Sequence, residues 1–247
     1  MRALVLCAGY GTRLGKRTAD TPKPFLSIEG KPLLEYIVCY LRQYNIKEIS
    51  INLHYLYESI VDYFGDGNRW GVRITYSYEK KLMGTAGGAK KLERFLSEDD
   101  DFLVVYGDVI TDQNLKDLVG AHRDSRAFAT ILCHRNANST SLISVNDKQR
   151  VVEYIERPSE SERQLHKSDL ANSGIYVLSS EIFRHIPEGV FYDFGSDVFP
   201  KIVGSEYVHS YELNGYRCAV DNEARYRQVI SDIQNGKLSV DTTHDSE

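Results

Sequence analysis

Short apolar runs alternate with segments of helical periodicity through the first half of the chain, and this alternation restricts the fold more than any other feature. Runs of strand length lie at residues 4–6, 48–53, 72–78 and 102–106. Between them, apolar residues recur at helical spacing over residues 32–41, 58–64 and 85–96. Strands that alternate with helices form βαβ units, and ligands then bind at the carboxyl ends of the strands. The chain therefore predicts an α/β fold, a Rossmann-like mixed, mostly parallel sheet flanked by helices.

The second half of the chain is richer in strands. We expect strands over residues 128–134, 142–145, 151–155, 171–178 and 215–220, and a closing helix over 223–234. No Pro/Ser-rich linker interrupts the pattern, and 247 residues can bury one large core. We therefore expect a single domain over residues 1–235, followed by a polar, disordered tail over 236–247.

Charge and composition exclude several classes of protein. Thirty Lys and Arg against 35 Asp and Glu give a net charge of -5, which argues against a general attraction to nucleic acid or to an anionic membrane. No apolar run approaches the roughly 18 residues of a membrane span, and no secretory signal is visible. We therefore expect a cytoplasmic protein with reduced, buried cysteines, since the four lack C-x-x-C spacing: Cys7, Cys39, Cys133 and Cys218.

A glycine-rich and cationic segment, residues 7–25, directly follows the first apolar run. It holds three glycines and four cationic side chains, among them Arg13 and Lys23. Backbone N–H groups of a glycine-rich turn can converge on an anion, and Arg or Lys adds charge-assisted hydrogen bonds to the same place. The segment therefore predicts a ligand with several phosphates.

Two common phosphate-binding loops do not match this segment. A dinucleotide fingerprint needs a third glycine after Gly9 and Gly11, and this chain has Leu14 there. The hypothesis of a nicotinamide-dependent oxidoreductase is thus supported only by the order of strand, glycine turn and helix. A P-loop would need Gly at Tyr10 and Ser or Thr at Arg17.

The combination that remains, G-x-G-T-R at residues 9–13 and P-K-P at 22–24, resembles the sugar-1-phosphate nucleotidyltransferases. Five further stretches occur in the order that this family shows, at residues 84–88, 106–108, 156–158, 172–176 and 197–201. The resemblance covers about residues 2–230, and residues 76–87 look most like the guanylyltransferases for mannose or heptose 1-phosphate. It implies a glycosyltransferase-A-like nucleotidyltransferase domain.

Members of this family join a nucleoside triphosphate to a sugar 1-phosphate and release pyrophosphate. The resemblance implies that Arg13, Lys23 and Asp108 are catalytic, with Arg13 on the β and γ phosphates and Lys23 near the α-phosphate. It implies a further set of residues that bind the nucleotide: Leu6, Ala8, Gly9, Gly11, Thr12, Glu79, Gly84, Thr85 and Gly107. Glu79 is the candidate for the N–H edge of guanine.

The sugar phosphate and the metal complete the implied site. The residues implied for the sugar phosphate are Glu156, Arg157, Asn172 and Gly174. Arg157 stands where the family usually has Lys, and a surface salt bridge between Glu156 and Arg157 is the alternative. Asp108 would bind Mg²⁺ together with Asp221, because Ala219 occupies the position of the usual second aspartate. The alternative for Asp221 is a cap of the closing helix.

The sequence constrains the substrates less than the reaction. GTP is the first choice of nucleotide and UTP or CTP the next, while the sugar 1-phosphate is not specified. A second hypothesis is a regulatory protein of the same fold that binds nucleotide sugars without making them, which Ala219 and Arg157 motivate. A homodimer is compatible with the size of the chain.

Overall fold

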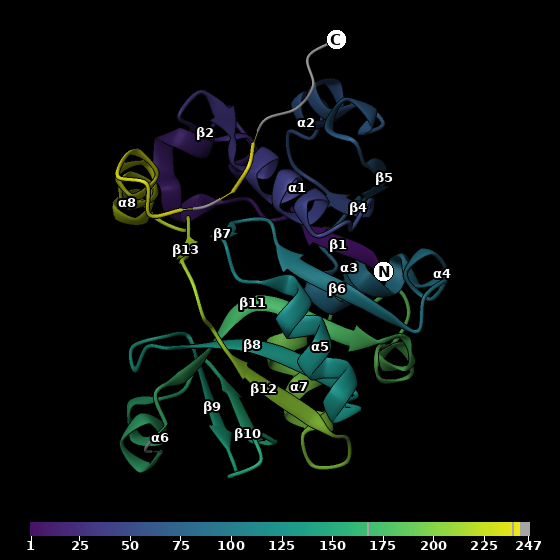
Figure 1. The fold of residues 1–247 in the computed structure, drawn as a ribbon, viewed down its shortest axis with the longest axis vertical. Coiled ribbons are helices and arrows are strands. Elements are labelled where there is room, and N and C mark those ends of the chain that lie inside the picture. The colour runs from purple at the N-terminus through teal and green to yellow at the C-terminus, as the bar shows by residue number, and fades with distance from the viewer. Residues whose placement is uncertain (167, 239, 243–247) are drawn as a thin grey trace. The chain divides into compact units, whose positions relative to one another are not determined.

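The structure is a computed structural model that describes residues 1–166, 168–238 and 240–242. Its contacts group the chain into two compact units, and neither is a continuous segment. The first unit comprises Met1–Leu82, Val105–Asn114 and Asn214–Glu247, and the second comprises Met83–Val104 and Leu115–Leu213. Figure 1 labels the elements along the chain. The single domain over 1–235 stays a prediction, and part of the proposed tail lies outside the described residues.

The first unit is built on a parallel sheet, as the alternating pattern predicts. Its strands are β1 (Arg2–Leu6), β4 (Glu48–Leu53) and β5 (Arg73–Tyr78), and β4 pairs in parallel with both of the others. The end of β6 (Asp101–Tyr106) lies beside β1. The carboxyl ends of β1 and β6 therefore meet at one edge, where the glycine-rich segment and Asp108 begin.

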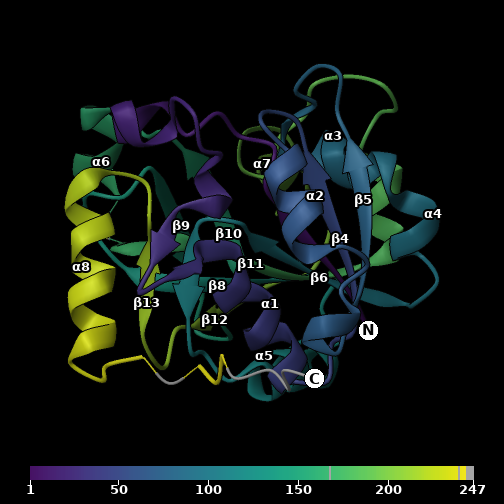
Figure 2. The same cartoon turned by 90° about the horizontal axis from the view of Figure 1, so that it is seen from above.

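Three helices of the first unit confirm the sequence pattern: α1 (Leu33–Gln43), α2 (Glu58–Phe64) and α8 (Glu223–Gln234). Helix α1 begins after Pro32 and is buried from Leu33 to Leu41, while α2 ends at Gly65, whose φ of 52° suits glycine. Four short strands complete the unit: β2 (Ser27–Ile28), β3 (Lys31–Pro32), β7 (Val109–Thr111) and β13 (Arg217–Ala219). Strands β13 and β7 pair antiparallel, and β13 leads toward α8 (Figure 2).

The second unit contains most of the antiparallel pairing. Its strands are β8 (Ala129–Arg135), β9 (Ser141–Val145), β10 (Val151–Glu156), β11 (Leu170–Ser179) and β12 (Val208–Glu212). Strand β11 pairs antiparallel with β8 and β9, and β12 pairs in parallel with β8. The start of β6 lies beside β11. The helices are α3 (Gly84–Lys91), α4 (Glu93–Leu96), α5 (Leu115–Ser125), α6 (Glu160–Leu165) and α7 (Phe199–Ile202).

Some elements differ from the sequence expectation. The helix predicted over 85–96 is two helices, because Leu92 between α3 and α4 departs from helical geometry at φ -101° and ψ 10°. Helix α5 and strand β12 carry no expectation from the sequence. In β12, the buried positions are Val208 and Ser210, and the polar Ser210 interrupts the apolar alternation that would indicate a strand. The strand is held in place by parallel pairing with β8.

The cysteines agree with the expectation from their spacing. Cys7, Cys39, Cys133 and Cys218 are buried and carry free thiols. Burial raises the pKa of the Cys39 thiol to about 11, so that thiol is protonated at neutral pH. Over the part of the chain that the structure describes, no helix has both the length and the apolar character needed to cross a membrane.

Candidate functional site

The glycine-rich segment leaves the carboxyl end of β1 and turns sharply at Gly11. The backbone N–H of Gly107 donates to the Leu6 carbonyl at 2.9 Å, which ties the ends of β1 and β6 together. Gly11 has a φ of 68°, and a Cβ there would lie 3.0 Å from the Cβ of Lys23. Gly11 thus provides both the left-handed turn and the close approach of the P-K-P segment. Thr18 closes the turn by donating to the Gly11 carbonyl at 3.0 Å.

Lys23 and Asp108 form a short ion pair at this edge. Pro22 and Pro24 flank Lys23 at the start of a 3-10 helix, Lys23–Phe25, and restrict its backbone. The Lys23 Nζ lies 2.5 Å from Asp108 Oδ2, and the two side chains are 13% and 22% exposed. Asp108 follows the end of β6 by two residues. The structure thus brings together two of the three predicted catalytic residues.

Arg13 pairs with Asp221, the other predicted metal ligand. Arg13 Nη1 lies 3.0 Å from Asp221 Oδ2, with the Arg13 side chain 68% exposed. The alternative role of Asp221 as the cap of α8 is wrong, because the Asn222 side chain accepts the Arg225 N–H at 3.0 Å and caps the helix instead. Asp221 therefore remains beside Arg13. We call the edge of the first unit that holds Arg13, Lys23, Asp108 and Asp221 the cationic edge.

Cations control the ionisation of Asp108. Burial alone would raise the pKa of this carboxyl, but Lys23, Arg217 and Arg13 together hold the pKa below its ordinary value. Burial lowers the pKa of Arg217 itself, and Asp108 and Asp221 both act against that shift. Asp108 is therefore a carboxylate throughout the neutral range. No motif in the sequence points to Arg217, although its charge acts on Asp108.

The backbone brings Asp221 close to Asp108, and both side chains carry the oxygen ligands that a hard divalent cation takes. The Val220 N–H donates to the Asp108 carbonyl at 2.8 Å, so Asp221 follows one residue after a direct backbone contact with Asp108. Mg²⁺ commonly takes one or two protein carboxylates together with phosphate oxygens of the substrate. Among the described residues, no group of three or more His, Cys, Asp or Glu side chains could hold a metal ion alone. A metal at this edge would need oxygens from a ligand.

Glu79 is more buried than a residue in direct contact with a nucleobase would be. Its side chain is only 4% exposed, and its Oε1 accepts a hydrogen bond from Asn52 Nδ2 at 2.8 Å. Asn52 Oδ1 in turn accepts the N–H of Cys7 at 2.7 Å. Contact of Glu79 with guanine stays a prediction, but the structure shows a connection from Glu79 to the start of the glycine-rich segment. Asn52 was not identified from the sequence.

Gly84 and Thr85 belong to the second unit, whereas the other predicted nucleotide-binding residues belong to the first. Gly84 has a φ of 74°, and a Cβ there would lie 2.5 Å from the Tyr192 carbonyl oxygen. The Thr85 N–H and hydroxyl both donate to Asp193 Oδ1, at 2.8 and 3.0 Å. The first turn of α3 therefore satisfies its donors with the 192–193 segment. Nucleotide binding by Gly84 and Thr85 stays a prediction.

Asn172 lies at the centre of a polar network in the second unit. Its Nδ2 donates to the Tyr154 and Tyr176 hydroxyl oxygens at 3.0 and 2.6 Å, and its Oδ1 accepts the Gly174 N–H at 2.8 Å. The pairing of β11 with β8 shifts register between Asn172 and Tyr176, and Gly174 has a φ of 79°. This bulge interrupts the ladder directly after Asn172, at the position of Gly174.

Glu156 joins the same network through Tyr154, whose hydroxyl donates to Glu156 Oε2 at 3.1 Å. Burial raises the pKa of Glu156, and Arg157 partly opposes this shift. Arg157 has a left-handed φ of 54° directly before Pro158, a conformation that is costly for a residue in that position. Among the residues that the structure describes, no ion pair joins the Glu156 carboxylate to the Arg157 guanidinium. Tyr154 could have been found from the sequence, since it lies two residues before Glu156 on the same strand face.

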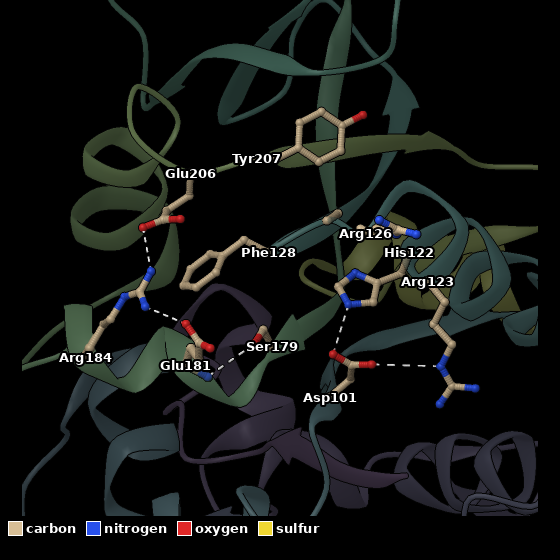
Figure 3. A pocket seen from close by; sticks show the side chains of 11 residues that line it. Asp101, His122, Arg123, Arg126, Phe128, Ser179, Glu181, Arg184, Glu206 and Tyr207 are labelled. Atoms are coloured by element: carbon tan, nitrogen blue, oxygen red, sulfur yellow. Dashed lines mark hydrogen bonds and ion pairs between the residues drawn. The ribbon is translucent and has the colours of Figure 1, made fainter.

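A pocket of the second unit contains none of the predicted site residues. Figure 3 shows Arg184 beside Glu181 and Glu206, and Arg123 beside Asp101. Arg184 pairs with Glu181 and Glu206 at 2.5 and 2.8 Å, and the Arg184 guanidinium lies 5.0 Å from the centre of the Phe128 ring. The lining holds three arginines and three carboxylates, so the charges of this pocket largely neutralise one another.

Comparison with known proteins gives a consistent family. The model of the family described as nucleotidyl transferase matches residues 2–218. A UTP–glucose-1-phosphate uridylyltransferase of Synechocystis sp. is 37% identical over 219 residues, which are 83% of this chain and 56% of that protein. A D-glycero-alpha-D-manno-heptose 1-phosphate guanylyltransferase of Campylobacter jejuni is 33% identical over 184 residues, 74% of this chain and 78% of that protein. The chain thus spans little more than half the length of the first of these relatives.

Solved structures support the fold. HddC from Yersinia pseudotuberculosis superposes with a TM-score of 0.79 at 22% identity, covering 94% of this chain and 99% of that one. A UDP-glucose pyrophosphorylase in complex with UDP-glucose superposes with a TM-score of 0.81 at 18% identity, covering 95% of this chain and 98% of that one. The mixed, mostly parallel α/β architecture expected from the sequence is confirmed.

Proposed function

This chain belongs to the nucleotidyl transferase family, and from that premise we propose that it transfers a nucleotidyl group from a nucleoside triphosphate to a sugar 1-phosphate. The observation that carries the proposal is the cationic edge of the first unit. There the glycine-rich segment, Lys23 and Arg13 gather around the carboxylates of Asp108 and Asp221. Two relatives with different nucleotides, one for UTP and one of the guanylyltransferase class, support the reaction class.

The proposed reaction needs no general base. An oxygen of the sugar phosphate, already an anion, attacks the α-phosphorus and forms a new P–O bond. The bond from the α-phosphorus to the bridging oxygen breaks, and pyrophosphate leaves with that electron pair. The protein must therefore hold two polyanions in line and stabilise the charge on the leaving oxygen. Cations and backbone N–H groups are suited to both tasks.

The residues of the first unit divide these tasks. Lys23, restrained by two prolines, is suited to the α-phosphate, where charge builds up in the transition state. Arg13, whose side chain is 68% exposed, is free to reach the β and γ phosphates. Gly9 and Gly11 would present backbone N–H groups to the triphosphate. Both cations would have to exchange a carboxylate for a phosphate when the nucleotide binds.

The residues of the second unit would bind the sugar phosphate. The Arg157 guanidinium can hold phosphate through two hydrogen bonds. Asn172 and Glu156 carry polar atoms suited to sugar hydroxyls, and Gly174 lets the backbone come close to the ring.

Mg²⁺ is part of the proposal. Asp108 and Asp221 would hold it, and the bound ion would neutralise phosphate charge. This chain's own carboxylates would then stay ionised on binding, which the lowered pKa of Asp108 favours.

We propose GTP as the first candidate nucleotide, supported by the guanylyltransferase relative, of which 78% is matched. UTP is the second candidate, supported by the uridylyltransferase at 37% identity. Mannose or heptose 1-phosphate would accompany GTP, and glucose 1-phosphate would accompany UTP. A cytoplasmic location and a homodimer stay predictions.

Release of pyrophosphate, measured for four nucleoside triphosphates against a panel of sugar 1-phosphates, tests the proposal. We expect one nucleotide to dominate and turnover to require both substrates. Asp108→Asn should nearly abolish turnover with the best pair, while Asp112→Asn, four residues along, serves as a matched control. Nucleotide binding without turnover across the whole matrix would instead favour a regulatory protein that binds nucleotide sugars.

A further inference from the structure

Two hydrogen-bonded connections run from Glu79 to the glycine-rich segment, and they use different parts of that residue. The Glu79 carboxylate accepts from Asn52 Nδ2 at 2.8 Å, and Asn52 Oδ1 accepts the Cys7 N–H at 2.7 Å. The Glu79 carbonyl oxygen lies 2.7 Å from His54 Nδ1, and His54 Nε2 lies 2.9 Å from the Tyr10 hydroxyl. Both connections lie entirely within the first unit.

The first connection is buried and leaves little freedom. The Asn52 and Glu79 side chains are 2% and 4% exposed. The Asn52 amide is oriented by its two partners, because only its oxygen can accept the Cys7 N–H and only its nitrogen can donate to a carboxylate. This connection therefore fixes the first residue after β1, where the glycine-rich segment begins.

The second connection holds a residue that its neighbours leave free to move. Tyr10 is 46% exposed and lies between Gly9, where a Cβ would meet open space, and Gly11 in the left-handed region. Its ring packs edge-on against His54, with 5.2 Å between ring centres, and 5.7 Å separates it from the Tyr55 ring. Without these contacts, glycines on both sides would let Tyr10 swing away from the edge.

The hydrogen-bonding pattern fixes the tautomer of His54. A backbone carbonyl can only accept, so Nδ1 carries the proton that faces the Glu79 oxygen. In the neutral ring Nε2 is then an acceptor, and the Tyr10 hydroxyl donates to it. The imidazole thereby links the Glu79 backbone to Tyr10, within the glycine-rich segment.

We propose that Asn52 and His54 are positioning residues that hold the glycine-rich segment ready for a triphosphate, with Glu79 as their common anchor. This inference rests on the proposed function and assigns Glu79 a structural role in place of direct contact with the base. Holding the N–H groups in place before binding reduces the entropy that a nucleotide would lose on ordering them. Loosening either connection should weaken nucleotide binding more than it slows turnover at saturation.

An exchange of functional groups tests the buried connection. Asn52→Asp places a second carboxylate oxygen against Glu79, and loss of a charge-assisted hydrogen bond predicts a nucleotide Kd about tenfold higher. Glu79→Gln keeps an acceptor for Asn52 and should change Kd less than about threefold. The double variant N52D/E79Q restores the hydrogen bond with donor and acceptor exchanged, so its Kd should return toward that of the unchanged protein.

Two readouts separate this inference from the proposed function. The first is the Kd for GTP and for UTP with Mg²⁺, each by titration calorimetry. The second is hydrogen–deuterium exchange of the backbone over residues 7–11 in the protein without nucleotide. We expect faster exchange in Asn52→Asp and recovery in the double variant. If neither nucleotide binds the unchanged protein, the proposed function fails, and exchange alone decides the inference.

The second connection, through His54 to the exposed Tyr10, provides a variant that should fold normally. Tyr10→Phe removes the hydroxyl and keeps the ring, and should raise Kd about threefold with kcat unchanged. Tyr55→Phe is the matched control, since its hydroxyl donates to the Ala19 carbonyl at 2.8 Å rather than to His54. The inference is overturned if Tyr10→Phe and Tyr55→Phe behave alike, if N52D/E79Q fails to recover, or if Glu79→Gln weakens GTP binding far more than UTP binding.

Discussion

Lys23 is the side chain on which the proposed chemistry most depends. Lys23→Ala removes the cation that we propose for the α-phosphate and leaves the Asp108 carboxylate, 22% exposed, without its ion-pair partner. Loss of one such contact should lower kcat by about 10²–10³. Lys16→Ala, on the same segment but exposed, is the control. Similar rates for the two variants in a pyrophosphate-release assay would contradict the role of Lys23.

His122 gives the protein a dependence on pH that is unrelated to catalysis. Its Nδ1 lies 2.9 Å from Thr130 Oγ1. Its Nε2 lies 3.2 Å from Asp101 Oδ1, a contact that Figure 3 shows. Burial lowers the pKa of His122, and Asp101 only partly opposes this shift. A histidine with a lowered pKa contributes stability above its ordinary pKa of about 6.5, and that stability is lost as the pH falls through the lower, folded value.

We therefore expect the melting temperature to fall as the pH is lowered from 7.5 to 5. His122→Gln should make this dependence shallower, because one of the groups that gain a proton on unfolding is gone. Burial also lowers the pKa of His209, so part of the slope should remain. Melting curves by circular dichroism at several pH values give the measurement, and an unchanged slope in the variant would contradict the assignment.

At the scale of elements, the ends of β1 and β6 are held together at a glycine. A Cβ at Gly107 would lie 2.5 Å from Cys7 Sγ and 2.6 Å from the Leu6 carbonyl oxygen. Gly107→Ala must therefore push the strand ends apart, which should cost about 3 kcal/mol of unfolding free energy. Gly120→Ala, in the middle of α5 with no atom within 4 Å of the new Cβ, should instead stabilise by up to about 1 kcal/mol. Urea denaturation compares the two, and equal stabilities would contradict the close contact.

The elements also show where sequence reasoning succeeds. Strand β4 and helices α2 and α8 match their predicted bounds, because their periodicity and end signals agree with their burial. The site could be predicted only in part. Motifs identify Lys23 and Asp108, but the pairing of Glu79 with Asn52 depends on the register of β4 against β5, which places Asn52 opposite Ser77. No local pattern in the sequence specifies that register.

At the scale of the whole molecule, ligand binding should appear as added stability. A nucleotide present at 100 times its Kd should add about 2.7 kcal/mol, which corresponds to a rise of roughly 5–10 °C in Tm for a protein of this size. We expect this rise with the accepted triphosphate and none with NAD(P). Differential scanning fluorimetry gives the measurement. A rise with NAD(P) and none with any triphosphate would favour an oxidoreductase.

The antiparallel pairing of β7 with β13 has a consequence for folding during synthesis on the ribosome. Residues 109–111 leave the ribosome about a hundred residues before their partners at 217–219. Until synthesis reaches that point, β7 presents an unpaired edge, and Asp221, which follows β13, has not yet been made. A nascent chain stalled before residue 214 should therefore depend on chaperones, because Asp221, the acidic partner of Arg13, is supplied only when translation passes residue 221.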